Sequence, residues 1–218
     1  MLTTYRVSRT LPQRLNWKIA FVSKVKYTTQ DASEQPLIHR LNVQIGKIVQ
    51  VERHPEAEHL YVEKVDLGEV TEENTPATRT IVSGIVKYMG IDDMLVSVQW
   101  LCSRWIYINK QVLVVGNMKP SKFRGILSQG MLLAASKGDQ VELLEPASGS
   151  VVGERVQVDG LDELATPDTV LKPKQKVMEQ VAEDLLTSDQ CVATWKDMPL
   201  KTSAGWVRCK SIQNGNIS

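Results

Sequence analysis

A succession of short apolar runs dominates the chain from residue 41 onward and limits the folds available to it. The runs are rich in Val and Ile and are separated by turn residues: LNVQIGKIVQV, HLYVEKVDLG, RTIVSGIV, KQVLVVG, GMLLAAS, QVELLEP and ERVQV. Runs spaced about ten residues apart predict the strands of a barrel or a sandwich. In the first run, Leu41, Val43 and Ile45 alternate with polar residues, and Gly46 stands where a strand must bend sharply. The sequence therefore predicts a mainly β fold, a small closed barrel over 41–160. A weak helix is expected at 86–95.

A change of composition after residue 160 marks a second region, 161–218. A polar stretch, DELATPDTVLKPKQK, leads to Pro173, which is acceptable in the first turn of a helix. Val177, Val181 and Leu185 then recur every four residues, which predicts one apolar stripe on a helix of roughly three turns. Two β-like runs, CVATWKDMPLKT and GWVRCKSI, follow. We expect a small α+β appendage whose helix packs on the barrel.

The N-terminal segment, 1–40, is basic, with no acidic residue before Asp31. This composition resembles an organelle transit peptide, although Pro12 interrupts any long amphipathic helix. A solvated basic arm is the other interpretation. We expect a cytoplasmic protein, with the mitochondrion as the alternative. The apolar stretch at 94–108 is too short and too interrupted by polar residues to cross a bilayer, so no membrane partner is expected.

Catalysis is the first function to test, and the three histidines are the natural candidates for a base or a metal ligand. His54 and His59 are five residues apart, whereas ligands on one helical face are three or four apart, and Pro55 indicates a turn. Neither these two residues nor His39 makes a convincing site, and the three widely spaced cysteines supply no paired metal ligands. The chain has no nucleophile elbow, phosphate loop, dinucleotide fingerprint or kinase signature. We therefore expect no catalytic residues, no metal site, no cofactor and no enzyme.

Nucleic-acid binding is the second function to test, and one segment, NMKPSKFRGILSQGM at 117–131, points to it. The net charge of +1 does not indicate a polyanion partner, so the interpretation depends on local charge. Lys119, Lys122 and Arg124 lie close together between two apolar runs, with Phe123 among them and Gly125 allowing close backbone approach. Basic loops with an aromatic residue on small barrels hold phosphates while a base stacks. A solvated basic turn is the alternative.

The order of these motifs resembles that of the tRNA-binding domain family. LNVQIGKIVQVERHPEAEHLYVEKVDLGE, RTIVSGIV, NMKPSKFRGILSQGMLLAAS, VELLEP and SVVGERV follow one another as in that family. The family includes endothelial-monocyte-activating polypeptide II, auxiliary proteins of multi-synthetase complexes, and appendices of some methionyl- and tyrosyl-tRNA synthetases. The resemblance continues through LKPKQKVMEQ and TSDQCVATWKDMPL, and covers about 41–215. It implies an oligonucleotide-binding barrel with a polypeptide-II-like appendage.

The resemblance also implies roles for individual residues. The strongest RNA-binding candidates are Lys119, Lys122 and Arg124, as phosphate contacts. The HPEAEHLYVEKVD segment is similar to a largely architectural part of the family, which assigns His54, Pro55, Ala57, Leu60, Tyr61 and Asp66 mainly to the fold, and Met131 to the core. Further positions match the RNA-binding face or a basic run of the family: Arg79, Ser83, Asn117, Ser128, Lys172, Lys174 and Lys176.

Two departures from the family pattern stand out. The apolar stretch VSVQWLCSRWIYI, an insertion near 96–108, separates the third and fourth barrel strands. It is either an error of the gene sequence or a flap that hinders the RNA face. Nothing before residue 41 resembles the docking domains of some full-length relatives, so the sequence does not indicate how the chain would dock to a synthetase.

The function that the resemblance implies is non-catalytic tRNA binding, as an aminoacyl-tRNA synthetase cofactor that captures tRNA through its backbone and shape. The expected partners are tRNA and a methionyl-, glutamyl- or tyrosyl-tRNA synthetase, and the chain alone is expected to be a monomer. A general single-strand binder is the alternative within the binding class. A synthetase-complex scaffold or signalling protein is the alternative outside it.

Overall fold

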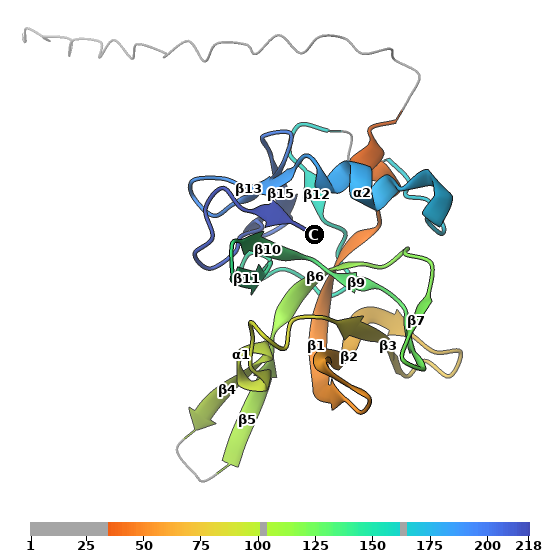
Figure 1. The fold of residues 1–218 in the computed structure, drawn as a ribbon, viewed down its shortest axis with the longest axis vertical. Coiled ribbons are helices and arrows are strands. Elements are labelled where there is room, and N and C mark those ends of the chain that lie inside the picture. Colours follow the sequence, from red (N-terminus) through yellow and green to blue (C-terminus); the bar gives the residue numbers. More distant parts are fainter. Residues whose placement is uncertain (1–34, 101–103, 162–164) are drawn as a thin grey trace, which may run out of the picture. The chain divides into compact units, whose positions relative to one another are not determined.

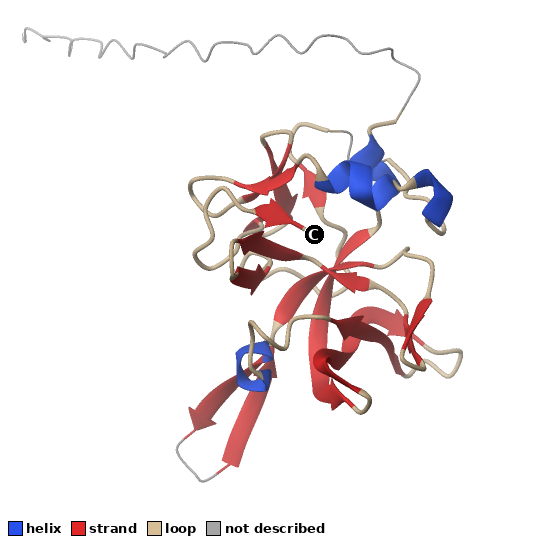
Figure 2. Ribbon diagram, in the orientation of Figure 1, coloured by secondary structure: helices blue, strands red, loops and turns tan. Residues whose placement is uncertain are grey.

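The computed structural model describes residues 35–100, 104–161 and 165–218 (Figures 1 and 2). The described residues from Gln35–Ser218 form one compact unit. The basic residues that suggested a transit peptide lie outside the described residues. The end of the predicted N-terminal segment is described and contains a 3-10 helix, η1 (Leu37–Arg40). Among the helices of the described segments, none has the length and apolar character that crossing a bilayer requires.

Five antiparallel strands form a curled sheet that makes half of the barrel (Figure 2). Its order is β3-β2-β1-β6-β9. The long strands β1 and β2 pair from Lys47↔Asp66 to His54↔Ala57, with register shifts that let the sheet bend. The predicted mainly β fold is confirmed. The strands are β1 (Val43–His54), β2 (Ala57–Val70), β3 (Pro76–Ser83), β6 (Gln111–Val115) and β9 (Met131–Leu132).

Gly46 lies where β1 passes beneath the side chains of its two neighbours. A Cβ atom at this position would lie 2.6 Å from Cγ1 of Val65 on β2 and 2.9 Å from Cγ2 of Val114 on β6. Both distances are shorter than carbon atoms tolerate, so a side chain here would push the inner faces of β2 and β6 apart. The bend that the sequence predicts at Gly46 is therefore also a close approach that only glycine permits.

A second sheet combines strands from both regions that the sequence distinguishes. Its order is β11-β10-β17-β13-β14-β15-β12, and β16 pairs with β15. The C-terminal strand β17 adds to β10 of the barrel at Ala135↔Ile217. The strands are β10 (Ala134–Lys137), β11 (Gln140–Leu143), β12 (Gln157–Val158), β13 (Leu185–Thr187), β14 (Ala193–Trp195), β15 (Met198–Thr202), β16 (Gly205–Trp206) and β17 (Asn216–Ile217).

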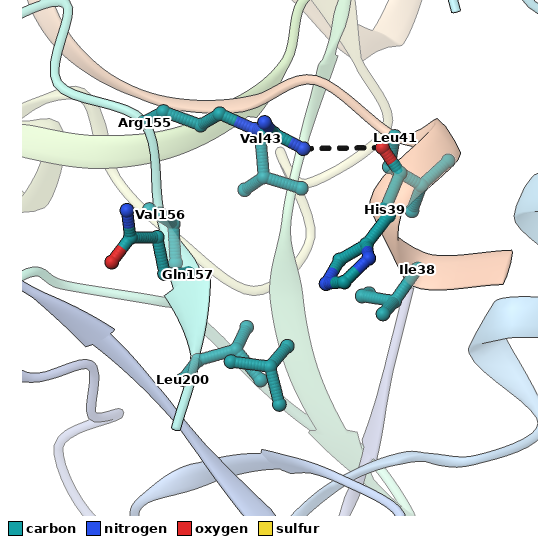
Figure 3. A pocket seen from close by; sticks show the side chains of 9 residues that line it. Ile38, His39, Leu41, Val43, Arg155, Val156, Gln157 and Leu200 are labelled. Atoms are coloured by element: carbon teal, nitrogen blue, oxygen red, sulfur yellow. Dashed lines mark hydrogen bonds between the residues drawn. The ribbon is translucent and has the colours of Figure 1, made fainter. Parts of the chain in front are cut away.

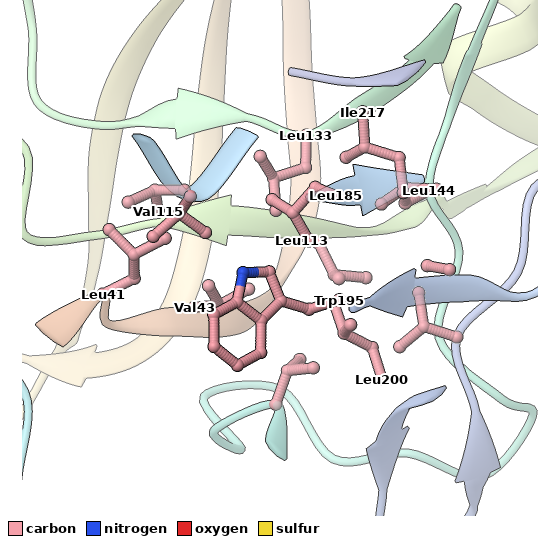
Figure 4. Close-up of a cluster of buried hydrophobic side chains, with 14 of the residues drawn as sticks. Leu41, Val43, Leu113, Val115, Leu133, Leu144, Leu185, Trp195, Leu200 and Ile217 are labelled. Atoms are coloured by element: carbon pink, nitrogen blue, oxygen red, sulfur yellow. The ribbon is translucent and has the colours of Figure 1, made fainter. Parts of the chain in front are cut away.

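One hydrophobic cluster continues from the barrel into the C-terminal region. Figure 4 shows Trp195 of β14 lying among Leu41, Val43 and Leu113, which belong to the barrel. Trp195 is 5% exposed and Leu113 is fully buried. A second cluster, which includes Ile48, fills the other end of the barrel. The two predicted regions thus share a core, while the boundary predicted at residue 160 stays a prediction.

The helix predicted over Val177, Val181 and Leu185 is shorter than expected. Helix α2 (Val177–Ala182) follows a 3-10 turn, η2 (Pro173–Gln175), and ends before Leu185. Leu185 begins β13 instead, because it pairs with Trp195 in the sheet. Strand pairing outweighs the four-residue spacing there. All three side chains are nevertheless buried in the shared core.

The weak helix predicted at 86–95 is only one turn, α1 (Ile91–Met94). The inserted stretch after it forms a hairpin of β4 (Leu95–Trp100) and β5 (Arg104–Asn109), paired from Leu95↔Asn109 to Trp100↔Arg104. Figure 1 draws this hairpin on the side of the barrel away from β7, the strand that carries the basic segment. In this position the described strands of the insertion do not cover that segment.

Candidate nucleic-acid interface

The basic segment forms a small hairpin, β7 (Ser121–Phe123) and β8 (Ile126–Ser128). At its tip Arg124 has φ of 45° and Gly125 has φ of 90°. Two consecutive left-handed residues make a type I′ turn, whose twist matches the flanking strands. An added Cβ at Gly125 would meet no atom within 4 Å, so glycine is favoured here by backbone conformation and not by crowding. The turn places Arg124 at the exposed tip.

The basic segment presents cations together with apolar side chains. Lys119, Lys122 and Arg124 are exposed. None of the three makes an ion pair with another described residue. Phe123 and Leu127 are each 43% exposed. Uncompensated cations beside an exposed ring suit a ligand that offers phosphates and flat bases.

Arg79, another predicted contact, is already occupied by the protein. Its guanidinium makes a two-pronged ion pair with Glu69, including a 3.0 Å bond from Nε to Oε2. It also donates to the carbonyl oxygens of Gly116 and Gln129. These two carbonyls flank the segment that carries the basic hairpin. Arg79 is therefore placed to fix both ends of that segment.

Asn117 is 5% exposed and uses its side-chain amide within the chain. Its Oδ1 accepts a 3.0 Å bond from the amide nitrogen of Asn42, and its Nδ2 donates to the carbonyl oxygens of Arg40 at 2.9 Å and Asp168 at 2.8 Å. Its carbonyl oxygen accepts from the amide nitrogen of Leu171 at 2.8 Å. Asn117 thus connects the basic loop to the start of β1 and to the 168–171 segment.

The second basic run begins directly after Leu171, beside this junction. Lys172, Lys174 and Lys176 are all exposed, and none makes an ion pair with a described residue. Because Leu171 is bonded to Asn117, the chain brings Lys172 and Lys119 to neighbouring stretches of surface. The two basic runs, separated in sequence by about fifty residues, can therefore serve one extended anion.

Ser128 and Ser83, both predicted contacts, use their hydroxyl groups within the protein. Ser128 is 4% exposed; its Oγ accepts from the amide nitrogen of Val82 at 3.0 Å and donates to the carbonyl oxygen of Gly130 at 3.1 Å. Ser83 donates a short hydrogen bond to Oε1 of Glu63. The serines therefore hold the base of the hairpin and the end of β3 in position, and have little freedom to bond RNA.

Glu63 is a buried acid that the sequence interpretation overlooked. It has no exposed surface, and its Oε2 has no hydrogen-bond partner in the described structure. Burial raises the pKa of its carboxyl to about 7, against 4.5 for an ordinary glutamate, although the bond from Ser83 opposes the rise. The sequence did contain a sign of this burial. Glu63 alternates with Tyr61 and Val65, and all three share the inward face of β2.

Replacing Glu63 with Gln should stabilise the protein above neutral pH. The folded state prefers the protonated acid, so this group's contribution is fully present below about pH 4.5 and is lost as pH rises through about 7. Gln mimics the protonated acid and should raise the free energy of unfolding at pH 8 by about 1–3 kcal/mol. Urea titrations at pH 5 and pH 8 measure this, with Glu58→Gln at an exposed position of the same strand as the control. An equal effect of Glu63→Gln at both pH values would contradict it.

Two cavities differ from the basic hairpin in chemistry. A cavity of about 20 Å³ lies between η1, β1 and β12, where Arg155 donates to the carbonyl oxygen of His39 at 3.1 Å (Figure 3). It has room for no more than about one water molecule. A wider cleft of about 930 Å³ is lined by both charge signs, with ion pairs Lys87–Asp139 at 3.6 Å and Lys110–Glu145 at 2.7 Å. Its paired charges do not favour a polyanion. Among the described residues, no cluster of three potential metal ligands occurs.

Comparison with known proteins identifies the family. Residues 43–155 match the model of the putative tRNA binding domain. The chain is 38% identical over 196 residues to aminoacyl tRNA synthase complex-interacting multifunctional protein 1 of Cricetulus griseus, covering 89% of this chain and 49% of that protein. It is 42% identical over 188 residues to the cytoplasmic methionine–tRNA ligase of Arabidopsis thaliana, covering 85% of this chain and 21% of that protein.

A solved structure extends the likeness across the C-terminal region. The crystal structure of the C-terminal domain of Plasmodium vivax p43 superposes with a TM-score of 0.71 at 33% identity, covering 83% of this chain and 98% of that one. The cytoplasmic tyrosine–tRNA ligase of Gallus gallus is 39% identical over 196 residues, covering 88% of this chain and 33% of that protein. The chain therefore spans half or less of the length of these curated relatives, and its match covers 98% of the solved C-terminal domain. It belongs to the tRNA-binding domain family, with an oligonucleotide-binding type of barrel and the C-terminal region of the p43 type.

Proposed function

We propose that this chain binds folded tRNA without catalysing a reaction, as an aminoacyl-tRNA synthetase cofactor. The observation that carries the proposal is a set of exposed cations that have no ion-pair partner among the described residues: Lys122 and Arg124 on a hairpin with a type I′ turn, and Lys119 just before it. This hairpin lies within the residues that match the tRNA-binding family. The absence of catalytic motifs from the sequence agrees with a binding role.

In this proposal, some residues contact the RNA and others hold the binding face in position. The hairpin cations and the second run, Lys172, Lys174 and Lys176, contact phosphates along the tRNA backbone. Phe123 offers a ring on which an unpaired base can stack. Recognition then depends mainly on backbone and shape, as is usual for folded RNA. Four residues support the face from within rather than touching RNA: Arg79, Ser83, Asn117 and Ser128.

The proposed partners follow from the names of the relatives. Those relatives include methionine– and tyrosine–tRNA ligases and a protein that interacts with the synthetase complex. We propose that the bound tRNA is delivered to a methionyl-, glutamyl- or tyrosyl-tRNA synthetase, which raises its local concentration there. The chain is proposed to act in the cytoplasm. It is also proposed to be a monomer, because the C-terminal region already covers an apolar face of the barrel.

Competition binding separates this function from general single-strand binding. Full-length protein is bound to a labelled tRNA, and the label is displaced by unlabelled tRNA or by a single-stranded RNA of equal length and composition. We expect the folded tRNA to compete at concentrations about tenfold or more lower, because an unfolded strand loses the shape that spaces the phosphates. Equal competition would instead support the single-strand binder.

A scaffold role gives a different result from the same protein. The test is whether synthetases co-purify with the chain after ribonuclease treatment. If they do, and the chain fails to bind tRNA, the result would favour a scaffold. Retention of the synthetase only while RNA is intact agrees with tRNA delivery.

A further inference from the structure

His54 connects the turn between β1 and β2 to the tip of the basic hairpin. His54 is 3% exposed. One ring nitrogen, Nε2, lies 3.0 Å from the carbonyl oxygen of Phe123. The other, Nδ1, lies 3.1 Å from the amide nitrogen of Glu56 in the turn that follows β1. The contact with Phe123 joins residues that are 69 positions apart in the chain.

These contacts define the tautomer of the ring. The backbone N–H of Glu56 can only donate, so Nδ1 must offer a lone pair and carry no proton. In a neutral imidazole the single proton is then on Nε2, which donates it to the carbonyl oxygen of Phe123. Both hydrogen bonds are satisfied only by this tautomer.

The accepting carbonyl belongs to the peptide unit between Phe123 and Arg124. That unit lies between the exposed ring of Phe123 and the exposed guanidinium of Arg124, and Lys122 is the residue before Phe123. The base of the hairpin is fixed by Ser128 through Val82 and Gly130. Within the described part of the chain, the hydrogen bond from His54 is the one that joins residues 122–125 to a residue outside the hairpin.

We infer that His54 is a positioning residue for RNA binding, which orders the hairpin tip before RNA arrives. The inference rests on the proposed function. A tip held in one conformation loses less conformational freedom on binding, so each phosphate contact contributes more affinity. The HPEA motif, which the sequence interpretation assigns mainly to the fold, would then act directly on the binding hairpin.

Two substitutions separate the two bonds of the ring. His54→Asn keeps an acceptor near the position of Nδ1 for the Glu56 amide but is too short to reach Phe123. His54→Gln places a donor near the position of Nε2. We expect His54→Asn to weaken tRNA binding about three- to tenfold, the value of one hydrogen bond, and His54→Gln to stay within about twofold of the natural protein.

A double-mutant cycle shows whether His54 acts through the hairpin. In a Lys122→Gln/Arg124→Gln background, His54→Asn should have almost no further effect on the dissociation constant for tRNA. An equal loss in both backgrounds would overturn the inference, since His54 would then act elsewhere. If the His54→Asn protein binds tRNA with full affinity while Lys122→Gln/Arg124→Gln clearly loses affinity, the positioning role alone is overturned. If the Gln pair itself binds normally, the proposed binding site is wrong.

A measurement on the unmodified full chain applies even if His54→Asn does not fold. Long-range proton–nitrogen spectra at pH 8 distinguish the two neutral tautomers of histidine. We expect His54 to carry its proton on Nε2. We also expect the backbone around Arg124 to be ordered and not to move freely. A proton on Nδ1, or a freely moving tip, would overturn the inference.

Discussion

Replacing Lys122 and Arg124 with Glu should lower tRNA affinity about 100-fold or more at physiological salt. Both side chains are exposed at the hairpin, so the fold should survive. Hydrogen bonds to charged groups contribute about 1.5–3 kcal/mol each, and a factor of ten in affinity is about 1.4 kcal/mol. Two lost contacts and two new repulsions therefore give at least two orders of magnitude. Fluorescence anisotropy with labelled tRNA measures the loss.

A matched control separates local contacts from net charge. Lys137→Glu/Lys210→Glu changes two exposed cations, one in the other sheet and one beyond it, and alters the net charge by the same amount as the hairpin pair. Because charges more than about 8 Å apart are largely screened at physiological salt, this control should lose only a few-fold in affinity. Comparable losses in the two double variants would contradict a specific role of the hairpin.

The salt dependence of the neutral pair gives an independent check. Lys122→Gln/Arg124→Gln should flatten the plot of log affinity against log salt by roughly 0.7–0.9 for each lost phosphate contact. If the residues only solvate a turn, the slope and the affinity should both stay unchanged. Normal binding by folded Glu and Gln variants across the salt series would remove the main support for the proposed site.

The strand pattern could be predicted from the sequence most directly where a run alternates between buried and partly exposed residues, whereas β6 is buried on both faces. Leu41, Val43 and Ile45 are buried as the alternation requires. The four-residue spacing that ends at Leu185 was misleading, because periodicity alone does not include the strand partner. Trp195 supplies that partner from ten residues further along the chain. Local pattern thus indicates which side chains are buried more reliably than which element carries them.

The candidate site could be predicted in part for a similar reason. Exposed cations such as Lys122 keep the chemistry that the sequence shows, since no described residue neutralises them. Arg79 and Asn117 have the same polar character in sequence, but their partners include Gly116 and Arg40, 37 and 77 residues away. Long-range pairing therefore decides whether a polar residue offers its hydrogen bonds to a ligand or to the fold. The local pattern of residues along the sequence does not show that pairing.

When the C-terminal region after residue 160 is removed, we expect the barrel to be neither monomeric nor cooperatively folded. The truncation would take away β17 from β10 and would uncover buried barrel residues such as Leu113, Val115 and Leu133. A contiguous apolar surface of this kind associates in water, so we expect dimers or aggregates. Size-exclusion chromatography with light scattering gives the mass. A clean monomer with a cooperative unfolding transition would contradict a shared core.

A single side chain tests the same contact without removing any of the chain. Trp195 lies among the barrel residues Leu41 and Val43, so Trp195→Ala should lower the free energy of unfolding by about 3–5 kcal/mol. Trp206→Ala is the matched control, because that ring is 46% exposed and should change stability by about 0.5 kcal/mol. A typical domain has only about 5–15 kcal/mol to lose, so the first variant should unfold at clearly lower urea. Equal midpoints for the two alanine variants would mean that the C-terminal region folds without support from the barrel.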